Sequence, residues 1–468
     1  MYKLSNYVIS EEIYDNNNII EKIICFNTRT STIKILDNNS YSFLKNGEFL
    51  SLEKDIFNAL IRDKFIVNEN ENELQIILEE NKEFIKNKKD LYLVIQPTAF
   101  CPFGCHYCGQ LHSPKGMSDE VQKQVIQRLR NKLSEKTYNS LRICWFGSEP
   151  LSGLHTIKNL STEFQSICNE KSLSYSAKIV TNGWKLTLPV AHDLINNHKI
   201  NHIEITLDGI EEFHDSRRHT KGGKKTFESI YDNLLNLCHI KDEKTNVSIR
   251  CNIDERNKEG ISPLIKKLAE DNLQDRISIY FAQIHSWGND AHKLAADKKN
   301  FSEWEIDWFI EMESYGFKVN YLHSRKKQVC MTLDPMSELI DPFGGIFGCT
   351  EVSLVPSYEK ENGSNVHQLG NSKNEYKTKL NKNIFADFYE EEEIKKYHCH
   401  TCEIFPICGG SCPKEWKEGR IPCPSIKFNI KQRLVLQSIK ELKNKEYMGF
   451  LEKITLENNK KPLPEVEY

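Results

Sequence analysis

Between residues 91 and 322, short apolar runs alternate with longer stretches in which apolar residues recur at helical spacing. The short runs have the length and the β-branched content of buried strands. In Phe227–Cys238, for example, Phe227, Ile230 and Leu234 fall on one helical face, and Thr226 precedes them as an expected N-cap. The predicted strands are 91–96, 141–146, 175–180, 202–207, 246–253 and 277–284. Strands and helices in this alternation predict an α/β domain with a parallel sheet.

A smaller module is predicted ahead of this region. Residues 19–26 and 31–36 have strand patterns, residues 52–62 have a helical pattern, and residues 64–67 form a final short strand pattern. Strands and helices in about 70 residues predict a small winged-helix-like domain. Residues 71–90 are predicted to form a charged linker helix.

Composition excludes several classes of protein. The 468 residues include 63 basic and 66 acidic side chains, and this balance leaves no basic footprint for nucleic acid. Residues 1–15 contain no apolar core of a signal peptide, and no stretch is apolar enough to span a membrane. Fifteen cysteines without a secretion signal indicate metal binding rather than disulfides. We therefore expect a cytoplasmic protein.

Three cysteines directly follow the first predicted strand. Cys101, Cys105 and Cys108 are spaced C-x3-C-x2-C. Three thiolates on one loop can hold three irons of a [4Fe–4S] cube and leave the fourth iron open for a small molecule. The alternative is a zinc loop, but a structural zinc site usually takes four protein ligands.

A second cysteine cluster follows the α/β region. It contains Cys330, Cys349, Cys399, Cys402, Cys408, Cys412 and Cys423. Glycines at 409 and 410 leave backbone amides free to donate hydrogen bonds to sulfur. A zinc ribbon is the alternative, since it also uses C-x2-C pairs. The other five cysteines stand alone among apolar neighbours, which indicates core packing; they are Cys25, Cys144, Cys168, Cys238 and Cys251.

The C-x3-C-x2-C loop, with Tyr107 before its last cysteine, resembles that of the radical S-adenosylmethionine (SAM) enzymes. In that family the amino and carboxylate groups of SAM chelate the open iron. One electron then cleaves the sulfonium and releases a 5′-deoxyadenosyl radical, which abstracts a hydrogen atom from the substrate. The resemblance implies a partial (β/α)6 barrel with its ligands at the carboxyl ends of the strands.

Motifs at successive strand ends extend the resemblance. Gly147-Ser148-Glu149-Pro150 is similar to the family's Gly-Gly-Glu-Pro, with Ser148 in place of the second glycine. Asn182 lies in a Thr-Asn-Gly motif, Asp208 directly follows the fourth strand, and Arg218 follows Asp215 by three residues. With Tyr107, these residues are the SAM contacts that the resemblance implies, and Arg218 would pair with the methionyl carboxylate. A surface salt bridge between Asp215 and Arg218 is the alternative.

The second cluster resembles the SPASM domain, the auxiliary-cluster extension of peptide-modifying radical SAM enzymes. By that resemblance Cys399, Cys402, Cys408 and Cys423 bind an outer [4Fe–4S] cluster, while Cys330, Cys349 and Cys412 bind an inner one. A fourth inner cysteine is missing, so the inner cluster is expected either to have an open iron or to take Asp334, Glu338, Asp341 or water as its fourth ligand. The predicted domains are 1–70, the linker helix 71–90, the radical SAM barrel 91–322, the SPASM domain 323–430, and a terminal helix and tail 431–468.

These features predict a peptide maturase with three [4Fe–4S] clusters that crosslinks a ribosomally made precursor peptide. Its expected partners are the peptide, whose leader the N-terminal module would bind, and an electron donor such as flavodoxin or ferredoxin. The same module could instead be a packing cap. The alternatives are a peptide epimerase with a thiol hydrogen donor such as Cys144 or Cys251, an enzyme like the sulfatase maturases, and a metal-stabilised binding protein. No catalytic side chain is assigned.

Overall fold

The computed structural model describes residues 1–14, 20–240, 245–373 and 380–442. By their contacts these residues form two compact units. One unit comprises Met1–Phe84, Asn320–Val329 and the described residues from Phe388 onward, and the other comprises Ile85–Val319 and Cys330–Asp387. In the described part of the chain, no helix combines the length and apolarity needed to cross a bilayer.

The second unit contains a sheet in the order β11-β10-β9-β8-β7-β6-β12-β13-β14. Neighbouring strands from β6 to β11 are parallel, as predicted, and β12 (Glu338–Ile340) pairs parallel to β6. Two short antiparallel strands, β13 (Gly345–Phe347) and β14 (Gln368–Asn371), complete the sheet. The six parallel strands are β6 (Asp90–Ile95), β7 (Ser140–Trp145), β8 (Ser174–Thr181), β9 (Ile200–Thr206), β10 (Asn246–Ile253) and β11 (Ile277–Gln283).

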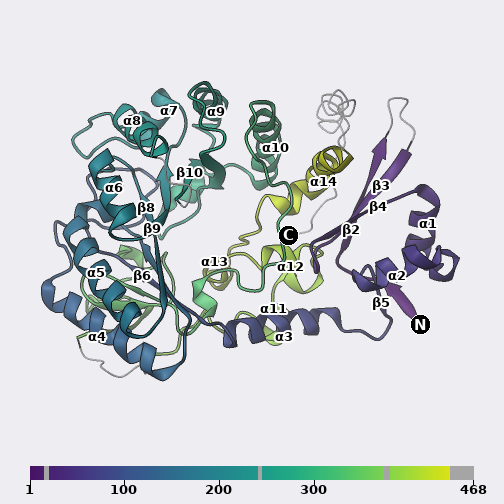
Figure 1. The fold of residues 1–468 in the computed structure, drawn as a ribbon, viewed down its shortest axis with the longest axis horizontal. Helices are drawn as coiled ribbons and strands as arrows, with labels where there is room; N and C mark the ends of the chain where they lie inside the picture. The colour runs from purple at the N-terminus through teal and green to yellow at the C-terminus, as the bar shows by residue number, and fades with distance from the viewer. Residues whose placement is uncertain (15–19, 241–244, 374–379, 443–468) are drawn as a thin grey trace. The chain divides into compact units, whose positions relative to one another are not determined.

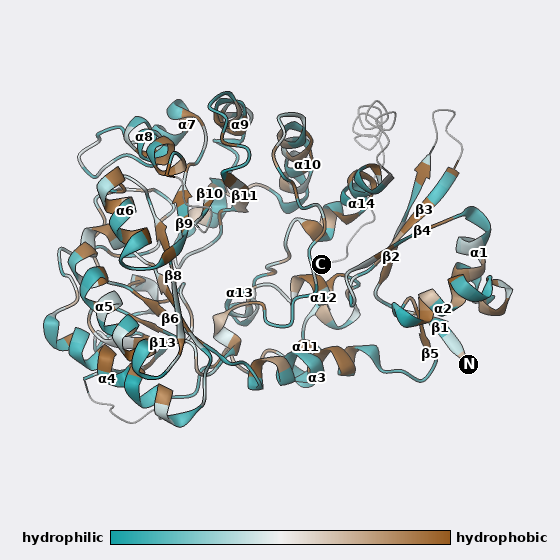
Figure 2. Cartoon of the chain, in the orientation of Figure 1, coloured by the Kyte–Doolittle hydropathy of each residue, from teal (hydrophilic) through white to brown (hydrophobic). Residues whose placement is uncertain are grey.

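Helices follow the parallel strands in alternation, which confirms the predicted α/β class (Figure 1). Helices α4 and α5 carry hydrophilic and hydrophobic residues on different parts of their surfaces (Figure 2), as amphipathic helices do. The helices are α4 (Asp119–Glu135), α5 (Leu154–Glu170), α6 (Leu188–Asn196), α7 (Glu211–Arg217), α8 (Phe227–Cys238), α9 (Ile261–Glu270) and α10 (Lys298–Ser314).

The parallel strands have two chemically different faces. Strand register places Ile143, Ile179, Ile203 and Ile249 on one face, where all four are buried. Helices α5 and α6 pack against this side of β7, β8 and β9. Because side chains alternate along a strand, the other face of the same strands carries the half-buried polar side chains Lys178, Glu204 and Arg250. A parallel sheet that is covered on both faces carries apolar side chains on both. Because this second face is polar, we infer that it is partly open.

In the first unit, β1 (Tyr2–Leu4) pairs with β5 (Ile66–Asn68), and three further strands form an antiparallel sheet. These strands are β2 (Val8–Tyr14), β3 (Ile20–Asn27) and β4 (Thr32–Leu36). The predicted strands near 19–26, 31–36 and 64–67 are present, and the predicted helix starts slightly later, as α2 (Lys54–Arg62). The remaining helices are α1 (Asn38–Asn46), α3 (Glu73–Lys86), α11 (Glu391–Ile394), α12 (Phe405–Cys408), α13 (Pro413–Lys417) and α14 (Ile426–Leu442).

The two ends of the chain share one core in this unit. Ile9 and Phe26 of the N-terminal sheet are buried in the same cluster as Ile407 and Leu434. The Thr28 hydroxyl also donates a hydrogen bond to the Glu403 carbonyl at 2.5 Å. The compact unit therefore joins segments that the sequence analysis assigned to separate domains, and the boundaries at 70, 90, 322 and 430 stay predictions.

Candidate active site and cluster-binding sites

The loop after β6 brings Cys101, Cys105 and Cys108 together. Burial raises the pKa of the Cys101 thiol, and the Glu149 carboxylate and the thiols of Cys105 and Cys108 raise it further. The Cys108 amide donates to the Cys105 carbonyl at 3.1 Å, which closes a tight turn. Thiols gathered in this way lose their protons when they bind metal. The donor set therefore fits an iron–sulfur cluster.

Among the described residues, no group of three or more His, Cys, Asp or Glu side chains converges on one metal ion. The ligands of a cube bind separate irons, so they do not need to meet at a single point. Next to the loop, His112 Nε2 lies 3.9 Å from Cys108 Sγ. Burial, aided by the Lys221 ammonium, lowers the pKa of His112 to about 4.

The predicted Gly-Gly-Glu-Pro-like motif lies at the carboxyl end of β7. Gly147 has φ 86°, and a Cβ there would lie 2.0 Å from Gln96 Nε2, so only glycine fits. Ser148 also has a positive φ of 49°, and its amide donates to Gln110 Oε1 at 2.8 Å. Pro150 opens a short 3-10 turn that leads into α5.

The Glu149 carboxylate connects two neighbouring strand ends. It accepts hydrogen bonds from the Thr181 hydroxyl at 2.6 Å and from the Asn182 amide at 2.8 Å. The Leu151 amide donates to it at 2.9 Å. Burial raises the pKa of Glu149, and these three hydrogen bonds oppose the shift. Glu149 therefore holds the ends of β7 and β8 together.

A second polar network joins the cysteine loop to the ends of β9 and β10. The Tyr107 hydroxyl donates to Asp208 Oδ2 at 2.6 Å, and the Asn252 amide donates to Asp208 Oδ1 at 2.8 Å. Arg218 donates to the Tyr107 hydroxyl. Burial opposes the charged form of Asp208, but Arg218 and Arg217 outweigh it and hold its pKa below the usual range. The structure thus brings Tyr107, Asp208 and Arg218 into one network, as their strand-end positions suggested.

Asp215 has a structural role that the sequence analysis did not identify. Its Oδ1 accepts hydrogen bonds from the Thr226 amide at 2.8 Å and the Phe227 amide at 2.9 Å, and so caps α8. Thr226 occupies the N-cap position, as predicted, but its side chain does not make the capping bond. Asp215 and Arg218 are both buried, and among the described residues they do not form an ion pair with each other. The alternative of a surface salt bridge is therefore wrong.

Several buried polar atoms at these strand ends have no hydrogen-bond partner in the described part of the chain. They include Ser148 Oγ, Asn182 Nδ2 and Arg218 Nε. Buried polar groups are nearly always hydrogen-bonded, so these atoms indicate a missing polar ligand. A hydroxyl, an amide and a guanidinium can bind the amino and carboxylate groups of SAM. The residues therefore fit this cofactor.

Sequence reasoning missed Gln110 and Gln96. Gln110 is buried, accepts from the Ser148 amide and donates to the Ser353 carbonyl at 3.2 Å. Gln96 Oε1 accepts from the Ser353 hydroxyl at 2.7 Å. These glutamines tie the SAM-type motif to the segment after Cys349. The one available signal was position, because Gln110 follows Cys108 by two residues and Gln96 is the last residue of the first predicted strand.

The four predicted outer-cluster cysteines line one cavity in the first unit. Cys399, Cys402, Cys408 and Cys423 all line this one small pocket. Burial raises the pKa of Cys399, and the other three thiols add to the shift. The Gly410 amide donates to Cys408 Sγ at 3.2 Å, as the glycine-rich turn predicted. The Lys427 ammonium lies 3.7 Å from Cys423 Sγ. Four converging thiols with hydrogen-bond donors fit a fully ligated cluster.

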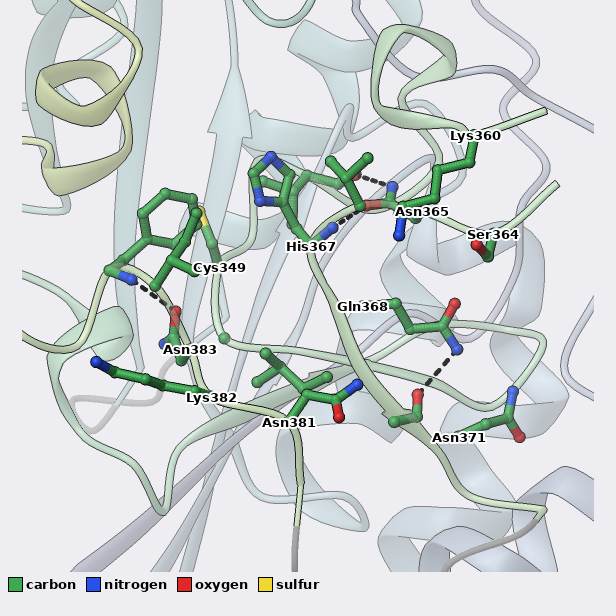
Figure 3. A pocket seen from close by; sticks show the side chains of 17 residues that line it. Cys349, Lys360, Ser364, Asn365, His367, Gln368, Asn371, Asn381, Lys382 and Asn383 are labelled. Atoms are coloured by element: carbon green, nitrogen blue, oxygen red, sulfur yellow. Dashed lines mark hydrogen bonds between the residues drawn. The ribbon is translucent and has the colours of Figure 1, made fainter. Parts of the chain in front are cut away.

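The predicted inner-cluster cysteines are divided between the units. Cys330 and Cys349 belong to the second unit, and Cys412 belongs to the first. Cys349 is buried two residues after β13 and lines a pocket of about 400 Å³ with His367, Asn365 and Asn383 (Figure 3). β14 forms one side of this pocket.

All three carboxylates considered as a fourth inner ligand have structural partners. Glu338 accepts two hydrogen bonds from Arg128, at 2.7 and 2.8 Å, and pairs with Lys132 at 2.7 Å. Asp334 accepts from the Ser337 hydroxyl at 2.8 Å. Asp341 accepts from the Gly345 amide at 2.8 Å, and burial raises the pKa of Asp341 to about 6. These contacts assign the three carboxylates to the fold of the second unit.

Replacing Glu338 by glutamine should destabilise the second unit by about 3–5 kcal/mol, because two buried cations lose their anion. Chemical denaturation followed by tryptophan fluorescence would measure the loss. Electron paramagnetic resonance (EPR) of any cluster in the refolded variant should match that of the wild type. A changed cluster spectrum with unchanged stability would instead make Glu338 a ligand.

Comparison with known proteins agrees with this site. Residues 95–267 match the family described as the radical SAM superfamily. The radical SAM cyclopropyl synthase TigE of Paramaledivibacter caminithermalis is 22% identical over 405 residues, which span 80% of this chain and 78% of TigE. The serine-type anaerobic sulfatase-maturating enzyme of Bacteroides thetaiotaomicron is 28% identical over 155 residues, or 31% of this chain and 36% of that enzyme.

Solved structures show the same fold. Native anSMEcpe with bound AdoMet has a TM-score of 0.54 at 17% identity and covers 79% of this chain and 100% of its own. The complex of anSMEcpe with AdoMet and the Cp18Cys peptide has a TM-score of 0.52 at 18% identity and covers 80% of this chain and 100% of its own. At such identities the likeness concerns the fold. Together with the family match over residues 95–267, which include the cysteine loop and the strand-end motifs, it shows a radical SAM enzyme domain in this chain; that family binds SAM and a [4Fe–4S] cluster.

Proposed function

We propose that this enzyme is a peptide maturase that introduces a crosslink into a ribosomally made precursor peptide. The observation that carries the proposal is the pocket lined by four cysteines, which suits an auxiliary cluster in a chain that also has a radical SAM domain. SAM and the clusters, when bound, supply the one-electron chemistry that removes a hydrogen atom from an unactivated carbon. Crosslinking releases a further electron, and an auxiliary cluster can accept it.

The relatives support a peptide or protein substrate. TigE is described as a cyclopropyl synthase, another relative is a sulfatase-maturating enzyme, and anSMEcpe has been solved with a bound peptide. The partly open polar face of β8, β9 and β10 gives such a chain hydrogen-bonding partners. A peptide whose backbone groups leave water needs partners of this kind.

The N-terminal part of the first unit supports recognition of a leader peptide. The sheet β2-β3-β4 has two edge strands, and an extended peptide can add to an edge by backbone hydrogen bonding. Helices α1 and α2 follow the sheet, which agrees with the proposed winged-helix-like module. A SPASM-type second half, with the inner cluster bound through Cys330, Cys349 and Cys412, completes the proposal.

An epimerase would need a hydrogen donor near the substrate, and the strand register distinguishes the two thiols considered for this role. Cys251 lies on the apolar face with Ile249 and is fully buried. Cys144 pairs in register with Lys178, so it lies on the polar face. Cys144 is nevertheless buried within an apolar cluster that includes Val94 and Phe347. The positions of both thiols favour crosslinking over epimerisation.

Co-expression with a candidate precursor peptide, followed by mass spectrometry, tests the proposal. Crosslinking lowers the peptide mass by about 2 Da, because two hydrogens leave as the new bond forms. A gain of about 1 Da in deuterium oxide, without a change in ordinary water, would mean epimerisation through an exchangeable thiol. An unmodified peptide despite active SAM cleavage would favour a folded-protein substrate instead.

A further inference from the structure

Two segments of the second unit meet at the cysteine loop and contain no carboxylate. Residues 96–118 include the loop itself, and residues 216–227 follow α7. Neither segment has an Asp or Glu, although the whole chain has 66 acidic and 63 basic residues. The Gly104 amide donates to the His219 carbonyl at 3.0 Å, and the Lys221 amide donates to the Pro102 carbonyl at 2.8 Å. Backbone contacts therefore hold a basic hairpin directly against the cluster-binding loop.

Three lysines make this region positively charged. Lys221 and Lys224 are exposed on the hairpin. Lys115 is exposed, and its carbonyl accepts from the Ala99 amide, two residues before Cys101. Lys225 pairs with Glu211 at 2.8 Å and adds little net charge. In the described part of the chain, the ammonium groups of Lys115, Lys221 and Lys224 have no carboxylate within 4.0 Å.

The cysteine loop itself reaches the surface here. Gly104 and His106, on either side of Cys105, are both exposed. Leu111, three residues after Cys108, is 61% exposed. An apolar side chain among positive charges resembles the centre and rim of a protein–protein interface.

We propose that Lys115, Lys221 and Lys224, together with Leu111, form the docking surface for a small acidic electron-carrier protein. The inference rests on the proposed function, since it concerns how the cluster at Cys101, Cys105 and Cys108 is reduced. One electron leaves a fully reduced flavin, which becomes its semiquinone, and enters the cluster, which passes from the 2+ to the 1+ state. Complementary charge would speed the encounter and orient the carrier over the exposed loop.

The test uses purified flavodoxin as the carrier and dithionite as a small reductant that needs no docking surface. In Lys221→Glu/Lys224→Glu, flavodoxin affinity measured by calorimetry should fall about tenfold or more and should lose most of its salt dependence. Flavodoxin-driven formation of 5′-deoxyadenosine should fall in parallel, while the dithionite-driven rate stays within about twofold. Lys171→Glu/Lys199→Glu is the matched control, because both exposed lysines precede strands at the opposite end of the sheet.

Unchanged flavodoxin affinity in the hairpin variant would overturn the proposal. An equal loss with both reductants would also overturn it, because the substitutions would then act on the cluster site. Weaker binding of a precursor peptide with unchanged flavodoxin binding would assign the surface to the substrate. If the wild-type holoenzyme fails to cleave SAM even with dithionite, the proposed function fails instead, and calorimetry still tests the docking surface.

Discussion

Replacing Cys101, Cys105 and Cys108 together by alanine should abolish reductive cleavage of SAM. It should also lower the iron content from about 12 to about 8 per chain, since one of three cubes is lost. The physical reason is that these three thiols are the predicted ligands on the loop after β6, so their removal leaves this loop without a thiolate to hold a cube. Anaerobic purification, iron analysis and detection of 5′-deoxyadenosine measure both effects. The outer cluster should be retained, because its four thiols lie in the first unit.

Cys168→Ala is the matched control for this variant. Cys168 is buried in the same unit, on α5, and is not predicted to bind metal. Its removal should leave about 12 irons in place and reduce stability only modestly, through lost packing. If the triple variant keeps its full iron content, the loop is not a cluster site. If the wild type holds zinc without iron, the assignment of all three clusters fails.

Replacing Cys399 and Cys408 by alanine should remove a cluster and also unfold much of the first unit. Cys408 belongs to the apolar cluster in which Ile9 and Phe26 of the N-terminal sheet pack against Ile407 and Leu434. Metal binding is coupled to folding where ligands come from segments that are otherwise held weakly. We therefore expect the N-terminal sheet to lose protection even though the substitutions lie almost 400 residues away in the sequence.

Hydrogen–deuterium exchange of β2 and β3, combined with iron analysis, measures this effect. Iron should fall by about 4 per chain, and exchange in both strands should rise. Cys25→Ala provides the control, since Cys25 is buried in β3 but belongs to a different apolar cluster. Loss of iron without faster exchange would show that the cavity binds a cluster that does not stabilise the sheet. Unchanged iron would exclude the cavity as a cluster site.

Periodicity determined much of the second unit. The six predicted strands correspond to β6–β11, because each is a compact apolar run with a helical pattern after it. The N-terminal strands β1 and β2 and helix α1 were missed. In β2, buried Ile9 and Ile13 are separated by polar residues, and the strand depends on pairing with β3 and packing against distant residues. Tertiary context of this kind commonly overrides local propensity.

The sequence by itself determined the local chemistry: the cysteine spacings, the motifs at strand ends and the α/β alternation. These features follow from residues close together in the chain, so spacing and periodicity reveal them. Only the tertiary structure decided which charged side chains find partners inside the protein and which stay exposed. It paired Glu338 with Arg128 and Lys132, turned Asp215 into a helix cap, and placed a basic hairpin beside the cluster-binding loop. Such contacts join residues far apart in sequence, and their partners are set by sheet order and packing, which no local pattern specifies.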